Sequence, residues 1–491
     1  MNAPINENTP VIISFAAAAD KTRVNNIAQS PDAIDLMLAA ITSAAKRVNI
    51  ENAIEQVDHI SVCQGMWPFN NPAEIIKQSL NASEATTGLT KIGVLQQQLI
   101  SDACLAIQQG KKSLCVVAGG EAKYRDLLAQ IHHVDLPQRE VQTEPDEVIE
   151  PDQELWLEAE SKAGLGMPVG YYALMDSAYQ AENQLSVETH REAISQLYQQ
   201  FSEVAEQNQQ AWKPKRLTAS EIKHSSDDNP MLAFPYTKRH NSSWNVNQAS
   251  ALIICSTQKA VELGVDPLHW VFPIAATAAN QMLSVTERTH LSRCIGAEIA
   301  AEKLFSMAKI SANDLDLIEL YSCFPIGVLS FAKALNLSLD TPLTTTGGMP
   351  FAGGPLNNFV IQSTVKTLSL LDQNKTNALV SNISGMNTKQ GLFLYSKTYQ
   401  PFQYAEITAE VKKIQQRKEV LNTFTGQASI IASTVLFNKN QPERVVIIAE
   451  NNNQRIIAFS QQDHYLDQFQ QATFISEKVF IKDGQFEMNL T

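Results

Sequence analysis

The chain contains no long hydrophobic run and no excess of basic residues. In its 491 residues no stretch of about 18 uncharged apolar residues occurs, so no membrane-spanning helix is expected. Its 38 Lys and Arg are outnumbered by 51 Asp and Glu, which gives a formal net charge of −13. Nucleic-acid binding generally requires a basic surface, so that class of function is not expected. An anionic small molecule remains an open ligand class, because local cations and helix N-termini bind phosphates even on acidic proteins.

Targeting and cysteine patterns are also missing. Residues 1–10 are polar and acidic and lack the basic start and apolar core of a signal peptide, so a cytoplasmic location is expected. The six cysteines are Cys63, Cys104, Cys115, Cys255, Cys294 and Cys323. No two of them have Cys-x-x-Cys spacing, so neither a metal site nor a redox pair is expected. We interpret them as reduced, mostly buried thiols.

An internal repeat is the most informative feature of the organisation. Residues 34–63 and 296–323 each show an apolar-periodic helix, a short connection and a buried strand, with "VDHISVC" and "LDLIELY" in equivalent places. A second helix–strand pair follows each copy, over 93–118 and 358–381. Short strands that are apolar on both faces and preceded by helices are typical of a sheet between helix layers. We predict two similar α/β halves; the alternative is chance similarity between generic α/β units.

Two further regions interrupt or follow this repeat. A Gln/Glu-rich insertion covers about 121–245, with helices predicted at 168–182 and 187–212. It is either a lid that covers a ligand or a decoration without such a role.

From about 404, polar and apolar residues alternate, which predicts strands at 407–414, 428–437, 444–450 and 455–459, then a hairpin at 478–490. These strands predict a small barrel, for which the oligonucleotide-binding (OB) topology is one candidate. We expect it to have a structural or interaction role rather than to bind nucleic acid. The predicted domains are 1–270, 271–403 and 404–491.

Four segments resemble the thiolase superfamily. They are "GVLQQQLISDACLAIQQG" (93–110), "SLCVVAGGEAKYR" (113–125), "ELYSCFP" (319–325) and "GGMPFAGGPLNNF" (347–359). They resemble, respectively, the nucleophile-bearing helix, the strand and Ala-Gly-Gly turn, the Asn-Glu-Ala-Phe or His-Asp-Cys-Phe loop, and the glycine-rich loop of that family. The likeness spans about 11–400.

The resemblance is greatest to the type-1 thiolase-like proteins, which carry an additional C-terminal domain. "MLAFPYTKRHNSSWNVNQASALIICS" (231–256) and the β-rich tail both agree with that branch. The resemblance implies a duplicated αβαβα layered fold with an inserted loop domain. It also implies an acyl-CoA acyltransferase similar to acetyl-CoA acetyltransferases, with coenzyme A or acyl-CoA as substrate or ligand and no covalently bound cofactor.

The three groups that ordinarily carry thiolase chemistry are missing from the matching positions. The nucleophilic cysteine, expected at a helix N-terminus that lowers its pKa and stabilises an oxyanion, falls on Gly93. The histidine before the loop proline is Gly354, and the second cysteine falls near Ser381 or Asn382. A glycine cannot transfer a proton, so ordinary Claisen chemistry is not expected at these positions.

What remains is a predicted pocket beside the start of the Gly93 helix. Its helix N–H groups can bind a carbonyl or an anion, and the neighbouring glycine pairs let a backbone approach a ligand closely. The predicted substrate-binding residues are Gly93, Phe324, Gly353, Gly354, Asn357, Asn358, Ser381, Asn382 and Lys238. For Asn357 and Asn358 the alternative is that one of them caps the next helix.

Cys323 is the one thiol in a loop that resembles an active-site loop. It is a candidate nucleophile, flanked by Tyr321 and Ser322 where some relatives have His and Asp; the alternative is a small buried residue at a strand end. His240 is interpreted as a solvated loop residue rather than a base. Lys238 and the adjacent arginine could meet coenzyme A phosphates or form a plain surface charge run.

Three functions therefore stay open. The chain could transfer or hydrolyse acyl groups, bind acyl-CoA without chemistry, or act as an interaction scaffold through its C-terminal domain. We expect a monomer or homodimer that contacts acyl-CoA but neither nucleic acid nor membrane.

Overall fold

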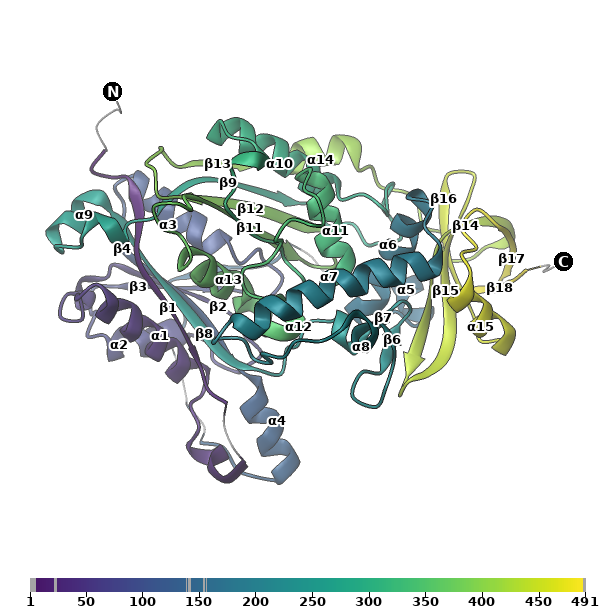
Figure 1. The fold of residues 1–491 in the computed structure, drawn as a ribbon, viewed down its shortest axis with the longest axis horizontal. Coiled ribbons are helices and arrows are strands. Elements are labelled where there is room, and N and C mark those ends of the chain that lie inside the picture. The colour runs from purple at the N-terminus through teal and green to yellow at the C-terminus, as the bar shows by residue number, and fades with distance from the viewer. Residues whose placement is uncertain are drawn as a thin grey trace.

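The computed structural model describes residues 6–21, 24–137, 139, 143–152, 155 and 157–488, and shows two similar α/β halves with a β-barrel at one end (Figure 1). The first half contains β1 (Pro10–Ala19), α1 (Ala33–Arg47), β2 (His59–Cys63), α2 (Pro72–Ser79), β3 (Thr86–Thr90), α3 (Gln98–Gln108), β4 (Leu114–Ala122) and β8 (Asn247–Ser256). The second contains β9 (Phe272–Asn280), α10 (Ile295–Ala308), β10 (Leu317–Glu319), α11 (Pro325–Ala334), α13 (Phe359–Leu368), β11 (Asn377–Ser384) and β12 (Lys389–Ser396).

The two sheets have the same strand order, which confirms the duplication. The first runs β1-β8-β4-β2-β3 and ends with β5 (Glu147–Ile149); the second runs β9-β12-β11-β10, with β13 (Gln403–Glu406) outside β9. β4 is parallel to β2 and antiparallel to β8, and β11 is likewise parallel to β10 and antiparallel to β12. The sheets join where Ile12 and Val271 exchange backbone hydrogen bonds of 2.9 and 3.0 Å.

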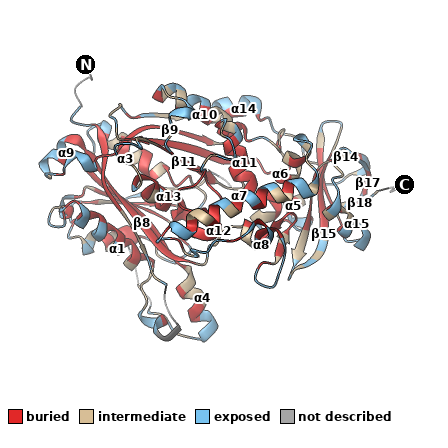
Figure 2. Ribbon diagram, in the orientation of Figure 1, coloured by how far each residue is buried: buried red, intermediate tan, exposed pale blue. Residues whose placement is uncertain are grey.

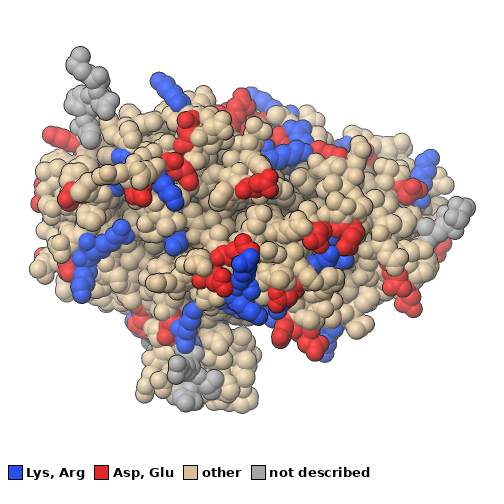
Figure 3. Space-filling view, viewed as in Figure 1, with Lys and Arg blue, Asp and Glu red and all other residues tan. Residues whose placement is uncertain are grey.

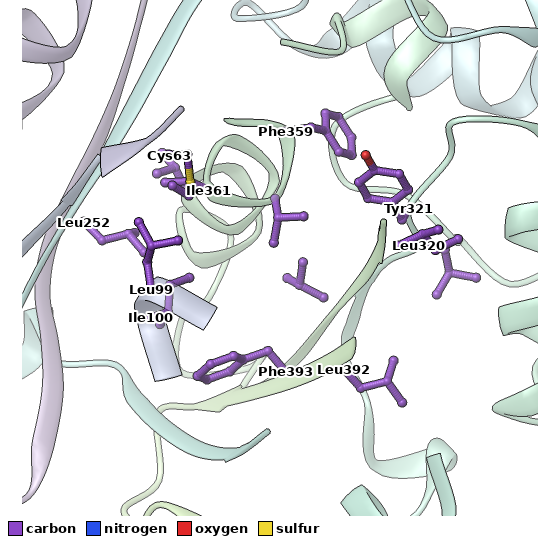
Figure 4. Close-up of a cluster of buried hydrophobic side chains, with 14 of the residues drawn as sticks. Cys63, Leu99, Ile100, Leu252, Leu320, Tyr321, Phe359, Ile361, Leu392 and Phe393 are labelled. Carbon is purple, nitrogen blue, oxygen red and sulfur yellow. The ribbon is translucent and has the colours of Figure 1, made fainter. Parts of the chain in front are cut away.

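The elements stack in five layers, as the resemblance implied. Helices α1 and α2 pack on the first sheet and α10 and α11 lie on the second, while α3 and α13 lie between the sheets. Both sheets and the two central helices are almost entirely buried (Figure 2). Apolar side chains from both halves fill the middle (Figure 4), among them Leu99 and Ile100 of α3, Ile361 of α13 and Phe393 of β12. The interior between the halves is therefore a continuous hydrophobic core.

Apart from its first helix, which contacts β8 of the first half, the insertion forms a helical layer over the end of the second half. It contains α4 (Lys123–His132), α5 (Glu158–Lys162), α6 (Pro168–Glu182), α7 (Val187–Gln207), α8 (Ala219–Lys223), β6 (Met231–Ala233) and β7 (Tyr236–Thr237). The predicted helix at 168–182 is confirmed with its bounds, and the one at 187–212 ends five residues early. Ser186 caps α7 because its hydroxyl accepts a hydrogen bond from the backbone N–H of Thr189.

The C-terminal strands close into a five-stranded barrel. It contains β14 (Thr425–Asn438), β15 (Gln441–Asn451), β16 (Gln454–Ser460), α15 (Asp463–Gln471), β17 (Lys478–Lys482) and β18 (Gln485–Glu487). Strand β14 pairs with both β15 and β17, which closes the ring β14-β15-β16-β18-β17, and α15 connects the third strand to the fourth. This closed ring has the OB topology that was the candidate for this region.

One predicted strand of this region is wrong. Residues 407–414 include a helix, α14 (Thr408–Ile414), which packs on α10. Ile407, Val411 and Ile414 are spaced by four and three residues, which is a helical period rather than a strand period. Because β13 and α14 both pack on β9, we propose that the C-terminal domain starts after 414 rather than at 404. Among the described residues, no helix has the length and apolarity that a membrane crossing requires.

A buried ion pair joins α6 to α7. His190 Nε2 lies 2.8 Å from Asp176 Oδ2, and neither side chain is more than 3% exposed. Burial alone would lower the pKa of His190, but the charge of Asp176 and its hydrogen bond outweigh burial and raise the pKa above 6.5. The stability that this shift contributes is fully present below pH 6.5 and is lost as the pH rises through the raised pKa.

We therefore expect His190→Gln to lower the melting temperature more at pH 6 than at pH 8.5. Removing one partner leaves Asp176 buried and unpaired, which costs about 3–5 kcal/mol when the pair is charged. Thermal unfolding followed by circular dichroism at both pH values would measure the difference. His464→Gln, at an exposed histidine on α15, is the control and should show no such pH dependence. An equal loss for His190→Gln at both pH values would contradict the assignment.

Candidate functional site

Several of the predicted site residues meet where β10, β11 and the start of α13 converge. The backbone N–H of Tyr321 donates to Ser381 Oγ at 2.8 Å, and its ring packs edge-on against Phe359 with centroids 5.6 Å apart. Figure 4 shows these two rings side by side beside the central layer. The structure thus brings together the loop after β10, the middle of β11 and the glycine-rich loop, as the resemblance implied.

The expected helix N-terminus at Gly93 is wrong. Helix α3 begins at Gln98, and Gly93 lies in a turn five residues earlier with φ +100° and Pro151 packed against it. Its carbonyl accepts a hydrogen bond from Lys389 Nζ at 2.5 Å, a buried lysine whose pKa burial lowers. Counting residues along the matching motif does not locate the end of a helix, because a turn and the first turn of a helix have similar composition.

Two glutamines missed by the sequence analysis lie between Gly93 and the start of α3 and join the two halves. Gln96 Oε1 accepts from the N–H of Val360 at 2.7 Å, and its Nε2 donates to the carbonyl of Leu356 at 3.1 Å. Gln97 lies directly over Gly391 and donates to the carbonyl of Thr277 at 2.9 Å. The run Gln96-Gln97-Gln98 was visible in the sequence, but its role depends on which strands and loops face it.

The glycine-rich loop makes room for protein rather than for a ligand. A Cβ at Gly354 would overlap Ser242 Oγ, and one at Gly353 would overlap the side chain of Gln248. A Cβ at Gly347 would overlap the backbone of α7 at Ala205. Helix α7 and neighbouring side chains fill the space that a side chain at each of these positions would need, so the glycines allow close packing within the protein, and their predicted contact with a ligand stays a prediction.

Three asparagines of the site keep unpaired amide groups inside this filled interior. Both amide atoms of Asn358 and of Asn382, and Nδ2 of Asn357, have no hydrogen-bond partner among the described residues. Asn382 is fully buried and pairs across the sheet with Gly391, so it lies on the same face as Gln97. Asn358 occupies the cap position of α13 without a side-chain cap hydrogen bond, so the capping alternative is wrong for this residue.

Cys323 has the geometry of a buried structural thiol. Its exposed fraction is 8%, and burial raises the pKa of its thiol to about 12 despite the hydrogen bond from the Tyr172 hydroxyl. The Tyr172 ring stacks on Phe324 at 4.2 Å. Ser322 is also buried, and its Oγ accepts from the backbone N–H of Met349 at 3.0 Å. A thiolate is the reactive form of cysteine, so this environment disfavours a nucleophilic role.

His240 is not a solvated loop residue. It is 1% exposed, with Nε2 3.2 Å from Ser195 Oγ and Nδ1 3.0 Å from Thr237 Oγ1. Burial, followed by the positive charge of Arg191, lowers the pKa of His240 to about 3. The ring is therefore neutral and fixed by two hydroxyls, which makes it part of the packing between α7 and the 234–240 segment.

Lys238, in contrast, is exposed and belongs to a cluster of cations. Desolvation, and then the charges of Lys238 and Arg239, lower the pKa of Lys213. Lys123 lies over the ring of Trp244, which is 42% exposed, at 5.5 Å. We call these five residues the basic patch; none of its cations forms an ion pair within the described part of the chain. Glu221 is a nearby acidic group, and its carbonyl accepts from Arg239.

The basic patch connects directly to the glycine-rich loop. The N–H of Lys213 donates to Phe351 and the N–H of Ser243 to Met349, so both segments flank α12 (Met349–Ala352). Figure 3 shows lysine and arginine side chains over the α7–α12 region, with aspartate and glutamate side chains close beside them. Sequence reasoning found Lys238 and Arg239 but missed Lys213, which lies outside the matching motifs, and Trp244, which lies within the 231–256 segment. No group of three or more metal-ligating His, Cys, Asp or Glu occurs within the described ranges.

Gly354→Ala tests whether the interior is closed. We expect it to destabilise the protein by at least about 2 kcal/mol, because the added methyl overlaps Ser242 in a packed core. Gly166→Ala is the matched control, since nothing lies within 4 Å of its would-be Cβ. Urea unfolding of both variants gives the comparison; an unchanged midpoint for Gly354→Ala would show that the space is open.

Alkylation tests the assignment of Cys323. Iodoacetamide at pH 8 should leave Cys323 unmodified in the folded protein, because its thiol is protonated and buried. Peptide mass mapping after a timed reaction measures this, and denatured protein, in which all six cysteines should react, is the control. Rapid selective alkylation of Cys323 would contradict a structural role.

Comparison with known proteins agrees with this architecture. Over 165 residues the chain is 29% identical to an acetyl-CoA acetyltransferase of Methanocaldococcus jannaschii, and over 216 residues 26% identical to one of Methanothermobacter thermautotrophicus. These matches cover 34% and 40% of this chain and only 40% and 53% of those relatives. No family model matches the chain.

Among solved structures, a monomeric SCP2-thiolase-like protein type 1 from Mycobacterium smegmatis superposes with a TM-score of 0.82. It is 20% identical, and the match covers 99% of this chain and 100% of that one. Human mitochondrial 3-ketoacyl-CoA thiolase in complex with CoA gives a TM-score of 0.57 at 16% identity, covering 81% of this chain and 100% of the other. The chain has the fold of the thiolase superfamily and, within it, resembles the type-1 thiolase-like proteins.

Proposed function

We propose that this protein binds coenzyme A or an acyl-CoA without catalysing thiolase chemistry. The observation that carries the proposal is the basic patch, whose cations form no ion pair among the described residues and one of which lies over an exposed tryptophan, on a protein of net charge −13. Coenzyme A joins phosphates to an adenine ring, so cations and an exposed aromatic face are the chemistry that recognises it. A solved relative of this fold, the human mitochondrial thiolase, was determined in complex with CoA.

The closed interior supports binding over catalysis. An acyl-transfer enzyme needs a nucleophile and a base within reach of the thioester. Here the position that matches the nucleophile is Gly93, the side chain of Ser242 occupies the space beside Gly354, and burial raises the pKa of Cys323 to about 12. The unpaired amides of Asn358 and Asn382 are the polar groups left to contact a carbonyl if the interior opens.

Calorimetry with coenzyme A tests the proposal. We expect the double variant Lys213→Gln, Lys238→Gln to weaken binding by at least about tenfold, roughly the loss of one charge-assisted contact. The control is the double variant Lys375→Gln, Lys439→Gln, which changes the net charge by the same amount at exposed positions away from the patch. It should bind coenzyme A like the native protein. Pantetheine, which lacks the nucleotide, should bind weakly to all three proteins.

An activity assay completes the test. Acetoacetyl-CoA with free coenzyme A should show no thiolysis above the buffer rate. Absence of coenzyme A binding at millimolar ligand would overturn the proposal, and so would turnover that depends on Cys323.

A further inference from the structure

A large groove lies where the α/β core meets the barrel, away from the basic patch. Its volume is about 780 Å³, within the range of small-molecule sites, and sites of this kind occur preferentially at domain junctions. One wall is the end of α6 and the turn into α7, the second is residues 289–292, and the third is the barrel. Helix α6 packs on β14, which fixes the barrel against the core at this place (Figure 1).

Fifteen residues line this groove, which we call the junction groove; nine are polar, and we call the six apolar ones its floor. Its apolar lining comes from the core on one side and from the barrel on the other. The residues are Ala178, Ala181, Leu185, Leu291, Ile431 and Ile475. The floor is built of aliphatic side chains, and no Phe, Tyr or Trp of the described ranges lines the groove. Such a surface fits an unbranched hydrocarbon chain better than a flat ring, which would need a stacking partner.

Two of the polar lining residues favour a negative group. Ser186 lines the groove and caps α7, so the positive end of a 21-residue helix faces the groove. Arg455 also lines the groove and is 4% exposed. Its Nη2 donates to the carbonyls of Arg288 and Thr289, and its Nη1 forms an ion pair with Glu450. Arg455 Nε has no partner among the described residues.

The acidic residue on the rim is already engaged. Glu182 accepts from Ser292 Oγ and pairs with Lys333 at 3.2 Å, so it does not oppose a ligand anion with a free charge. His290 is the remaining titratable group of the lining. Burial lowers its pKa most, and the positive charge of Arg293 lowers it further. The charges of Glu298 and Glu182 act in the opposite direction, while Arg455 also lowers the pKa.

We propose that the junction groove binds one medium-chain fatty carboxylate, with the hydrocarbon chain along the apolar floor and the carboxylate near Arg455 and the start of α7. The site is separate from the proposed coenzyme A site. Helix α7 starts at the groove and its 21 residues span about 30 Å, and the segment after its far end carries Lys213. The barrel supplies one wall, which gives the additional domain a role in binding.

Calorimetry with dodecanoate below its micelle concentration tests the site in the full-length protein. We expect one dodecanoate per chain. Ala181→Trp places a large ring on the floor and should weaken binding at least tenfold. The matched control is Val261→Trp, at a 68% exposed position on α9 (Thr257–Glu262), which should bind like the native protein.

Two comparisons distinguish specific binding in the junction groove from general adsorption of an amphiphile. Dodecyltrimethylammonium, with the same chain and a positive head, should bind at least tenfold more weakly than dodecanoate. Ala181→Trp should bind coenzyme A with native affinity, which shows that the variant is folded and that the two sites are independent. Equal dodecanoate binding by Ala181→Trp, or equal binding of the cationic amphiphile, would overturn the proposal whatever the outcome with coenzyme A.

Discussion

The packing between the starts of α3 and α13 is the constraint on which the site depends. Gln96 ties the turn before α3 to the glycine-rich loop through Val360 and Leu356, and Gln97 fills the space over Gly391. Both side chains are buried, so each must form hydrogen bonds in this one arrangement or lose free energy. These contacts hold the two halves together and fill the interior between them.

The charged groups that can bind a ligand lie at the surface rather than in the interior. The basic patch lies beside α12, one backbone hydrogen bond from the glycine-rich loop, and its cations lack carboxylate partners within the described ranges. Cations without carboxylate partners repel one another, and an anion that binds among them offsets this repulsion. Binding without catalysis is therefore consistent with a core that is filled and a rim that is charged.

The barrel is an integral part of the architecture rather than an appended module. The backbone of Phe234 in the insertion donates to Val435 of β14, and Arg455 of β16 donates to two carbonyls of the core. These contacts fix the barrel against α6 and create the junction groove. A domain held in this way contributes walls to a site, whereas a domain on a flexible linker could not.

The sequence by itself determined the elements. Strands β2, β4, β10 and β11, helix α6 and the barrel hairpins follow from local periodicity and turn residues, and the repeated pattern predicted two equivalent halves. The glycines at 93 and 354 were readable in the same way, because the identity of a residue needs no coordinates, and the loss of thiolase proton-transfer groups that they imply stays a prediction.

Only the tertiary structure decided what fills the space between those elements. Gln96, Ser242 and Ala205 come from different segments of the chain, and no local pattern shows that each of them packs against a different part of the glycine-rich loop. The burial of His240, the grouping of Lys213 with Lys238 and the junction groove have the same origin. The periodicity of a sequence shows which face of a helix or strand is apolar. Which side chains fill the space between two elements depends on packing between segments far apart in the chain.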